Sequence, residues 1–516
     1  MRKVLAKVFK FIFSRSLIII LMILLQIAVL AVGMVYLNKV FPAFMWIMYA
    51  ISAIILLYIA NRDEPAEFKL IWAVIMVVLP VVGVLLFSFH VSNWGMLSLK
   101  KKVDTEIMVT RHLMKTSDGT RESLKGENRQ IQGFSHFMEQ KCGYPTFRNA
   151  RLTYYPIGEE CIEAIKEELK TAKKYIFMEY FIISQGQVWD EVLEILRTKV
   201  EEGVEVKVMY DGLCSLLSLP YHYPKKLQAM GIDAKMFAPI IPFLSTTQNN
   251  RDHRKILVID GRVAFTGGIN MADEYANLIE VYGHWKDVGI KIEGRAVMSM
   301  TRMFIQNWNL YGKVEVDYEK YLFELVDRSE HFKYDGYIIP YADAPTINYE
   351  IGKSVYSELF RTATSYVHVM MPYFIVDREF FNAIRSAALR GVDVKLILPH
   401  IPDKKSAFAM ARSSYPDLLE AGVKVYEYTP GFVHAKVAVA DDKAASVGSV
   451  NLDYRSFYHH FENGIYLYDS SVIADIEKDF QDTLLKSREV DMEYYKNINV
   501  LYRAAGVLLR LVAPLM

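Results

Sequence analysis

The chain has 516 residues, too many for one ordinary domain, and this length allows two to four. Its net charge of +1, from 60 basic and 59 acidic residues, argues against a nucleic-acid-binding protein, because such proteins usually carry a strong basic excess. A composition that is 52% hydrophobic excludes a disordered or collagen-like chain, and the three cysteines, at unrelated spacings, form neither a disulfide framework nor a zinc site.

Three apolar runs occupy most of the first ninety residues, at 17–37, 41–60 and 70–89. The first run would form roughly 31 Å of helix, which is enough to cross a bilayer core. A cleaved signal peptide is the alternative, but no small-residue cleavage site follows this run and two more apolar runs come after it. We therefore expect residues 1–98 to be a membrane segment with two or three transmembrane or re-entrant helices, followed by a linker at 99–130.

The orientation of this segment is left open by the sequence. Five basic residues before position 16 favour a cytoplasmic N-terminus. Three full crossings would then place the C-terminal body on the far side, yet three lysines at 100–102 favour the cytoplasm for the body as well. Either one run is a re-entrant or interfacial hairpin that bends at Pro80 and Gly83, or all three runs cross the membrane and the body lies outside the cytoplasm despite the lysines.

From about residue 130, short β-type runs alternate with helical stretches, which predicts an α/β fold. The body also contains an internal repeat with a period of about 180 residues. Residues 172–181 (AKKYIFMEYF) resemble residues 363–374 (ATSYVHVMMPYF), each reading as a helix end, an apolar strand and a Tyr-Phe pair. This duplication predicts two domains, at 131–317 and 318–516.

Both halves carry the same motif of a histidine, a lysine two residues later and an aspartate five residues after that: His253, Lys255 and Asp260, and His434, Lys436 and Asp441. On a strand, the histidine and lysine point to the same face. The four apolar residues after each lysine predict a buried strand that turns at the aspartate. One such motif carries limited information, whereas two copies at matching places in a repeat are far beyond chance.

The partner strand in each half brings back a small-residue segment that ends in an asparagine, TGGIN at 266–270 and VGSVN at 447–451. Small residues let backbone N–H groups approach a ligand closely, and the side chains of Asn270 and Asn451 add a donor. Each half thus offers an imidazole, an ammonium group and amide donors. This set suits a phosphate oxyanion, with the imidazole as nucleophile or proton carrier.

With these motifs the chain resembles the phospholipase D superfamily, in which two HKD motifs meet in one pseudo-symmetric active site. With its apolar N-terminus it is similar to the two-motif bacterial cardiolipin synthases. The segments RDHRK at 251–255, HWKD at 284–287 and RLVAPL at 510–515 also carry the resemblance. Lys286 and the three apolar runs, where two are commoner, depart from the family pattern. The resemblance implies two pseudo-symmetric domains of mixed sheets flanked by helices, behind a transmembrane segment, in a multi-pass protein of a bacterial cell membrane.

The resemblance also implies roles. His253 would attack phosphorus and His434 would protonate the leaving alcohol, while the phosphate would be held by Lys255, Lys436, Asn270 and Asn451. Asp287 and Glu462 follow the two histidines by 34 and 28 residues, and each is expected to accept the N–H of its own half's imidazole. Asp260 and Asp441 are motif members that we expect to support the turn and the neighbouring His and Lys, with direct catalysis as the alternative.

The implied reaction transfers a phosphatidyl group between two phosphatidylglycerol molecules through a phosphatidyl-histidine, giving cardiolipin and glycerol. It calls for no cofactor, metal or nucleic acid, because protein cations neutralise the phosphate. The alternatives are a phospholipase D or transphosphatidylase that uses water or serine, and a catalytically dead membrane scaffold, which the intact motifs disfavour. Residues 500–516 are expected to form either a packed terminal helix or a helix in the lipid headgroup region.

Overall fold

The computed structural model describes residues 43–91, 94–214, 218–239, 249–311, 315–324, 332–347 and 349–515, with isolated positions between 28 and 39. The first apolar run of the sequence, 17–37, lies almost entirely outside the described residues. Among the helices that are described, none is both long enough and apolar enough to cross a membrane.

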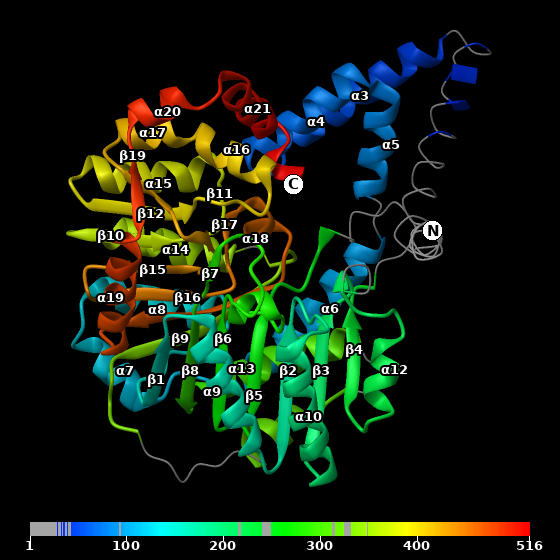
Figure 1. Cartoon of the computed structure of the whole chain (residues 1–516). Coiled ribbons are helices and arrows are strands. Elements are labelled where there is room, and N and C mark those ends of the chain that lie inside the picture. Colours follow the sequence, from blue (N-terminus) through cyan, green and yellow to red (C-terminus); the bar gives the residue numbers. More distant parts are fainter. Residues whose placement is uncertain are drawn as a thin grey trace, which may run out of the picture.

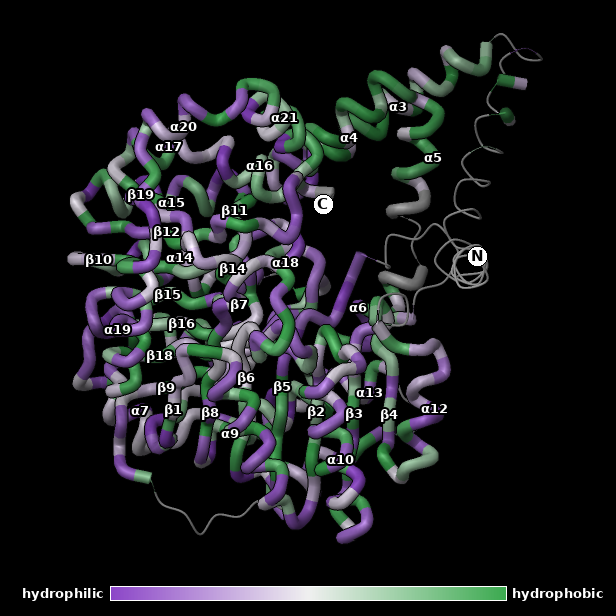
Figure 2. Tube along the Cα trace, in the orientation of Figure 1, coloured by the Kyte–Doolittle hydropathy of each residue, from purple (hydrophilic) through white to green (hydrophobic). Residues whose placement is uncertain are grey.

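The second and third apolar runs form three helices, α3 (Phe44–Ala60), α4 (Ala66–Val78) and α5 (Pro80–Val91). The third run is broken between α4 and α5 at Leu79, directly before Pro80, as the sequence predicts. The two helices approach each other closely at Gly83. A Cβ on this residue would lie only 2.9 Å from Cα of Met76, so the approach requires a glycine. The three helices pack on one another and project from one corner of the body (Figure 1), and they form its most continuously apolar region (Figure 2).

The first half of the body is built on a seven-stranded mixed sheet. Its strands, in spatial order, are β1 (Ala150–Tyr155), β8 (Gly289–Gly294), β6 (Val263–Gly267), β5 (Lys255–Ile259), β2 (Tyr175–Tyr180), β3 (Glu205–Asp211) and β4 (Asp233–Phe237). β2, β3 and β4 are parallel, and the remaining pairs are antiparallel. Helices α9 (Gly158–Lys170) and α10 (Gln187–Glu201) cover one face and α13 (Val297–Leu310) the other, so β5 is buried along its whole length.

The second half repeats this arrangement in an eight-stranded sheet. Its spatial order is β19 (Ser487–Val490), β13 (Lys424–Tyr428), β12 (Asp393–Pro399), β10 (Tyr366–Met370), β15 (Val437–Ala440), β16 (Ala444–Gly448), β18 (Glu462–Tyr468) and β9 (Tyr337–Asp343). The parallel strands β10, β12 and β13 correspond to β2, β3 and β4, and β15 corresponds to the motif strand β5. The predicted α/β duplication is therefore confirmed.

The two halves pack against each other through elements that cross between them, as Figure 1 shows. Helix α8 (Arg129–Gln140) comes before the first sheet in sequence, yet the Phe134 ring lies 4.7 Å from that of Tyr466 on β18. Residues 99–130, predicted as a linker, instead contribute most of α6 (Trp94–Thr110) and all of α7 (Asp118–Lys125), whose Val103 and Leu124 are buried in the main core. The halves thus share one core, and the active-site motifs meet where they join.

Candidate active site

Main-chain pairing between the halves brings the two motifs together. The segment before His434, β14 (Gly431–Val433), runs parallel to β7 (His284–Lys286) of the first half, and the His434 N–H donates to the carbonyl of Lys286 at 2.7 Å. The reciprocal contact also exists, because the His253 N–H donates to the carbonyl of Phe461 at 2.9 Å. Each histidine is therefore anchored beside the segment that carries the other half's acidic residue.

The imidazole–carboxylate pairs are consequently crossed between the halves. Nδ1 of His253 lies 3.0 Å from both carboxylate oxygens of Glu462, and Nδ1 of His434 lies 2.6 Å from Oδ2 of Asp287. The prediction that each acid serves the imidazole of its own half is wrong, because the main-chain pairing places each acid next to the opposite motif. Since the carboxylates engage Nδ1, the Nε2 atoms of both rings remain for phosphorus or a proton.

The two motif lysines are buried with the histidines. Nζ of Lys255 donates to the carbonyl of His253 at 2.6 Å, and Nζ of Lys436 lies 2.9 Å from Nδ1 of His434. Burial, followed by the charge of Lys436, lowers the pKa of Lys255 to about 7, and burial lowers the pKa of Lys436 to about 8. Two ammonium groups so close together in a buried site are suited to binding an anion.

Burial shifts the pKa values of the two imidazoles in the same direction, whereas the pKa values of the two acids end up shifted in opposite directions. It lowers the pKa of both His253 and His434 well below the ordinary value, so that both rings are neutral near pH 7. Burial raises the pKa of Asp287 to about 7, although Lys436 opposes it. Burial also acts to raise the pKa of Glu462, but the contact with His253 outweighs this and holds that pKa below its ordinary value. The two pairs therefore differ in where a proton resides.

Glu462 has further partners that the sequence did not reveal. The hydroxyl of Ser449 donates to one carboxylate oxygen, Ser456 donates to the other at 2.7 Å, and Nδ1 of His460 lies 3.6 Å away. All three lie within 449–462, after the second motif, and this shared segment is the one signal that points to them. No periodic pattern or repeat identifies them.

The small residues of the first half make room for the acid and not, as predicted, for a ligand. A Cβ on Gly268 would lie 2.0 Å from Oδ1 of Asp287. In the second half, Ser449 takes the corresponding place and binds Glu462 instead. The same small-residue pattern thus holds an orienting carboxylate in both halves.

The two asparagines that match in sequence differ in their surroundings. Oδ1 of Asn270 accepts the Ile182 N–H at 3.0 Å, and its amide donates to the hydroxyl of Tyr275 at 2.7 Å. Oδ1 of Asn451 is buried and has no hydrogen-bond partner among the described residues. Phosphate binding by both side chains stays a prediction. The unpaired Oδ1 of Asn451 is an acceptor, so it is the amide N–H groups that would have to hold a phosphate oxygen.

The motif aspartates Asp260 and Asp441 lie far from the imidazoles. They adopt left-handed φ angles of 54° and 55° directly after β5 and β15. The five-residue spacing along nearly extended chain puts the Cα of each aspartate up to roughly 17 Å from the Cα of its motif lysine. Each accepts backbone N–H groups at 2.7–2.8 Å, from residues 173–175 and 364–366 respectively. These hydrogen bonds support the predicted role at the turn and argue against direct catalysis, but none of them reaches the motif histidine or lysine, which the aspartates were also expected to support.

Comparison with known proteins agrees with this geometry. Residues 165–308 and 356–484 match the family model described as cardiolipin synthase, PLD-like domain. The chain is 31% identical over 510 residues to a cardiolipin synthase of Halalkalibacterium halodurans, covering 96% of this chain and 99% of that protein. The chain belongs to the cardiolipin synthase family. It is also 43% identical over 460 residues to an uncharacterized protein of Streptococcus mutans, covering 89% of this chain and 99% of the relative.

The fold of this family member is shared with a solved structure. The phosphatidylserine synthase of Haemophilus influenzae Rd KW20 superposes with a TM-score of 0.55 at 17% identity, covering 75% of this chain and 98% of that one. At this identity the match concerns the fold alone. The predicted resemblance to the phospholipase D superfamily and to its cardiolipin synthases is confirmed by the family match and the close relatives.

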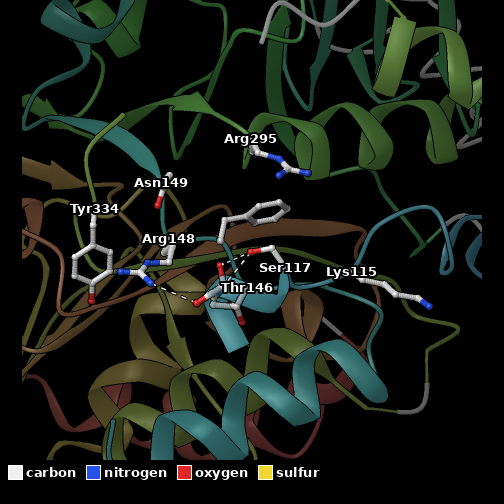
Figure 3. Close-up of a pocket in the computed structure, with 10 residues that line it drawn as sticks. Lys115, Ser117, Thr146, Arg148, Asn149, Arg295 and Tyr334 are labelled. Carbon is white, nitrogen blue, oxygen red and sulfur yellow. Dashed lines mark hydrogen bonds between the residues drawn. The ribbon is translucent and has the colours of Figure 1, made fainter. Parts of the chain in front are cut away.

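Two other features of this cardiolipin synthase family member have the form of ligand sites. A cavity of about 350 Å³ (Figure 3) includes no residue of either motif in its lining, which consists of Lys115, Ser117, Gly119, Thr120, Thr146, Phe147, Arg148, Asn149, Arg295 and Tyr334. Within the catalytic centre, ligand atoms of His253, His460 and Glu462 lie within 4.8 Å of one another, a spacing that a metal ion can use. The adjacent lysines would repel a cation, so the donors of this centre fit an anion better.

Proposed function

We propose that the protein is a phosphatidyltransferase that makes cardiolipin and glycerol from two molecules of phosphatidylglycerol. The observation that carries this proposal is the pair of HKD imidazoles, each held by a carboxylate from the opposite half and each with the buried lysine of its own motif beside it. Two close cations and two oriented imidazoles suit in-line displacement at a phosphodiester, and the family supplies the lipid substrate.

In the first step, the phosphate of phosphatidylglycerol lies against Lys255 and Lys436, and Nε2 of His253 attacks phosphorus. An N–P bond forms and the P–O bond to the headgroup glycerol breaks. His434 gives its Nε2 proton to the departing oxygen. The buried His434–Asp287 pair can keep this proton near neutral pH, because burial raises the pKa of Asp287 to about 7 and the bound phosphate offsets the lysine charges.

In the second step, a glycerol hydroxyl of another phosphatidylglycerol gives its proton to His434 and attacks phosphorus. The N–P bond to His253 breaks, and cardiolipin leaves. One phosphodiester replaces another, so the exchange is nearly balanced in energy and needs no nucleotide. Asn270 and Asn451 are proposed as further phosphate ligands, through the N–H groups of their side-chain amides.

The proposal is tested with purified full-length protein in vesicles of phosphatidylglycerol alone, in EDTA and without CTP, with lipid products separated by mass spectrometry. We expect cardiolipin and glycerol in equal amounts, and no product from the His253→Ala variant. Phosphatidic acid as the main product would instead identify a phospholipase D, and a requirement for serine or CDP-diacylglycerol would identify a different transferase.

We further propose that one flank of the molecule lies on the membrane, with residues 1–98 as its membrane segment and residues 131–317 and 318–516 as the catalytic domains. The terminal helix α21 (Val500–Arg510) packs on α16 (Lys405–Ser413) through Gly506, its one buried residue, and leaves Leu501 and Leu508 exposed by 79% and 66%. On the same flank (Figure 1), Phe68 of α4 lies 5.3 Å from the Tyr458 ring.

An exposed apolar helix beside apolar α3–α5 suits the headgroup region of a bilayer. A double variant, Leu501→Asp and Leu508→Asp, should bind phosphatidylglycerol vesicles more weakly in flotation assays, while a Val500→Ile variant should float as the wild type does. Unchanged flotation of the double variant would show that α21 does not contact lipid.

A further inference from the structure

The catalytic centre contains a third imidazole, that of His460, which the mechanism above does not use. His460 lies between α18 (Tyr454–Tyr458) and β18, and its ring centroid is 5.4 Å from that of His253. The side chain is 7% exposed, and neither ring nitrogen has a hydrogen-bond partner among the described residues. Leaving buried polar atoms unpaired destabilises the folded protein, so their retention calls for an explanation.

The ring is oriented by the same carboxylate that orients the nucleophile. Nδ1 of His460 is 3.6 Å from Oε1 of Glu462, beyond hydrogen-bond distance, whereas Nδ1 of His253 is 3.0 Å from the same group. Glu462 already accepts hydrogen bonds from His253 and from two serine hydroxyls. Both imidazoles therefore turn Nδ1 toward Glu462 and Nε2 away from it, which leaves the Nε2 of His460 without a described acceptor beside the Nε2 that attacks phosphorus.

The first half has a matching feature at the matching position. Trp285 lies two residues before Asp287, as His460 lies two residues before Glu462, and its ring centroid is 5.4 Å from that of His434. Its Nε1 is also buried and has no hydrogen-bond partner among the described residues. One unpaired donor can be a packing accident, but two at symmetric places around one phosphate-binding centre point to oxygens supplied by a ligand.

We propose that His460 is a catalytic residue that donates its Nε2–H to a non-bridging oxygen of the reacting phosphoryl group, next to His253. The inference deepens the proposed function and rests on it only in requiring a phosphate at this centre. The bond strengthens as negative charge develops on the phosphoryl oxygens, so it stabilises the transition state more than the bound substrate. Nearby Glu462 stabilises any positive charge on the ring.

Three substitutions of His460 separate this role from a structural one. Gln can place an amide nitrogen where Nε2 lies, Asn reaches only the Nδ1 position, and Phe keeps the ring without its nitrogens. Tungstate, an oxyanion shaped like phosphate, serves as the probe in calorimetry with the purified full-length protein in detergent. His459→Gln is the matched control, because the Nε2 of this neighbouring histidine lies 3.2 Å from the Pro514 carbonyl.

We expect His460→Gln and His459→Gln to bind tungstate within about threefold of the wild type, and His460→Asn and His460→Phe to bind it at least tenfold more weakly. Turnover of phosphatidylglycerol by His460→Phe and His460→Asn should fall by about 10²–10³-fold. The melting temperature of His460→Phe should stay the same or rise, because the substitution removes unpaired buried nitrogens. Such a result separates loss of function from loss of folding.

Wild-type tungstate affinity and turnover in His460→Phe would overturn the proposal. So would activity that is lost in EDTA, restored by Zn²⁺ and accompanied by bound metal in the wild type but not in His460→Phe, because His460 would then be a metal ligand. If tungstate binding follows the expected order but phosphatidylglycerol yields no cardiolipin, the proposed function fails and the oxyanion role of His460 stands.

Discussion

The two halves of the molecule carry the same motif on corresponding strands but surround it differently. Glu462, which binds His253, also accepts hydrogen bonds from two serine hydroxyls. Its pKa is lowered by the imidazole despite burial. Asp287, which holds His434, has the Val288 N–H as its additional partner, and burial raises its pKa to about 7. In the first pair, an ionised Glu462 beside a neutral His253 suits a nucleophilic imidazole. In the second pair, Asp287 and His434 share a proton, which suits a general acid and base. The surroundings, more than the motif, thus separate the two roles.

Removing each imidazole is the strongest test of this difference. With a phosphatidyl substrate that carries p-nitrophenol, the leaving group needs no proton, so His434→Ala should release about one equivalent of nitrophenol and then stall. His253→Ala, lacking the nucleophile, should show no burst. Steady turnover should fall by at least about 10⁴-fold in both variants. A burst in His253→Ala would show that the roles are reversed, and a burst in neither would contradict the covalent mechanism.

If each carboxylate serves the imidazole of the opposite half, its removal should affect a different step than if it served the imidazole of its own half. Glu462→Gln should abolish the nitrophenol burst, because the amide favours the His253 tautomer that carries its proton on Nε2 and cannot attack. Asp287→Asn should retain the burst and slow the second step. The losses in steady turnover should be about 10²–10⁴-fold. Stopped-flow absorbance separates the two phases. The opposite pattern, with the burst lost in Asp287→Asn, would mean that each acid serves its own half during catalysis.

The loss of kcat/KM at alkaline pH should follow deprotonation of Lys255 first and of Lys436 at a higher pH. Their pKa values are lowered by burial, to about 7 for Lys255 and about 8 for Lys436, so the required ammonium forms are present at low pH and lost as pH rises. Removing either by substitution with Met should cost about 10²–10³-fold. In pH profiles, Lys255→Arg should move the limb up toward pH 8, whereas Lys436→Arg should leave it near 7. A limb that neither variant moves would show that another group titrates.

The motif aspartates should give the smallest catalytic effect. Asp260→Asn and Asp441→Asn each weaken a set of backbone hydrogen bonds at a turn, and we expect about 1–3 kcal/mol less stability in denaturant unfolding. Turnover of the folded protein should remain within about threefold of the wild type. A hundredfold loss of kcat with unchanged stability would restore the aspartates to a direct catalytic role.

The sequence was sufficient to predict the duplicated α/β body, both motifs and the turn role of Asp260, because each depends on local pattern or on the repeat. It did not predict the crossing, since Asp287 and Glu462 have the same spacing whichever imidazole they hold, and pairing between halves decides it. His460 has no counterpart of its own type in the first half, so the repeat hides it. The helices within 99–130 cannot be predicted from local pattern, because Val103 and Leu124 become core residues only through contact with the body.

Neither half of the molecule by itself pairs its motif histidine with a carboxylate. The reciprocal exchange, in which His253 uses the acid of the second half and His434 the acid of the first, is the contact pattern of an isologous dimer. A single half, as a free polypeptide, would obtain a working pair only by meeting a second copy of itself. Two such copies joined end to end would form both pairs within one chain, which is the arrangement of this molecule. Copies joined in one chain need not be identical, so two serines can surround one acid while a glycine makes room for the other.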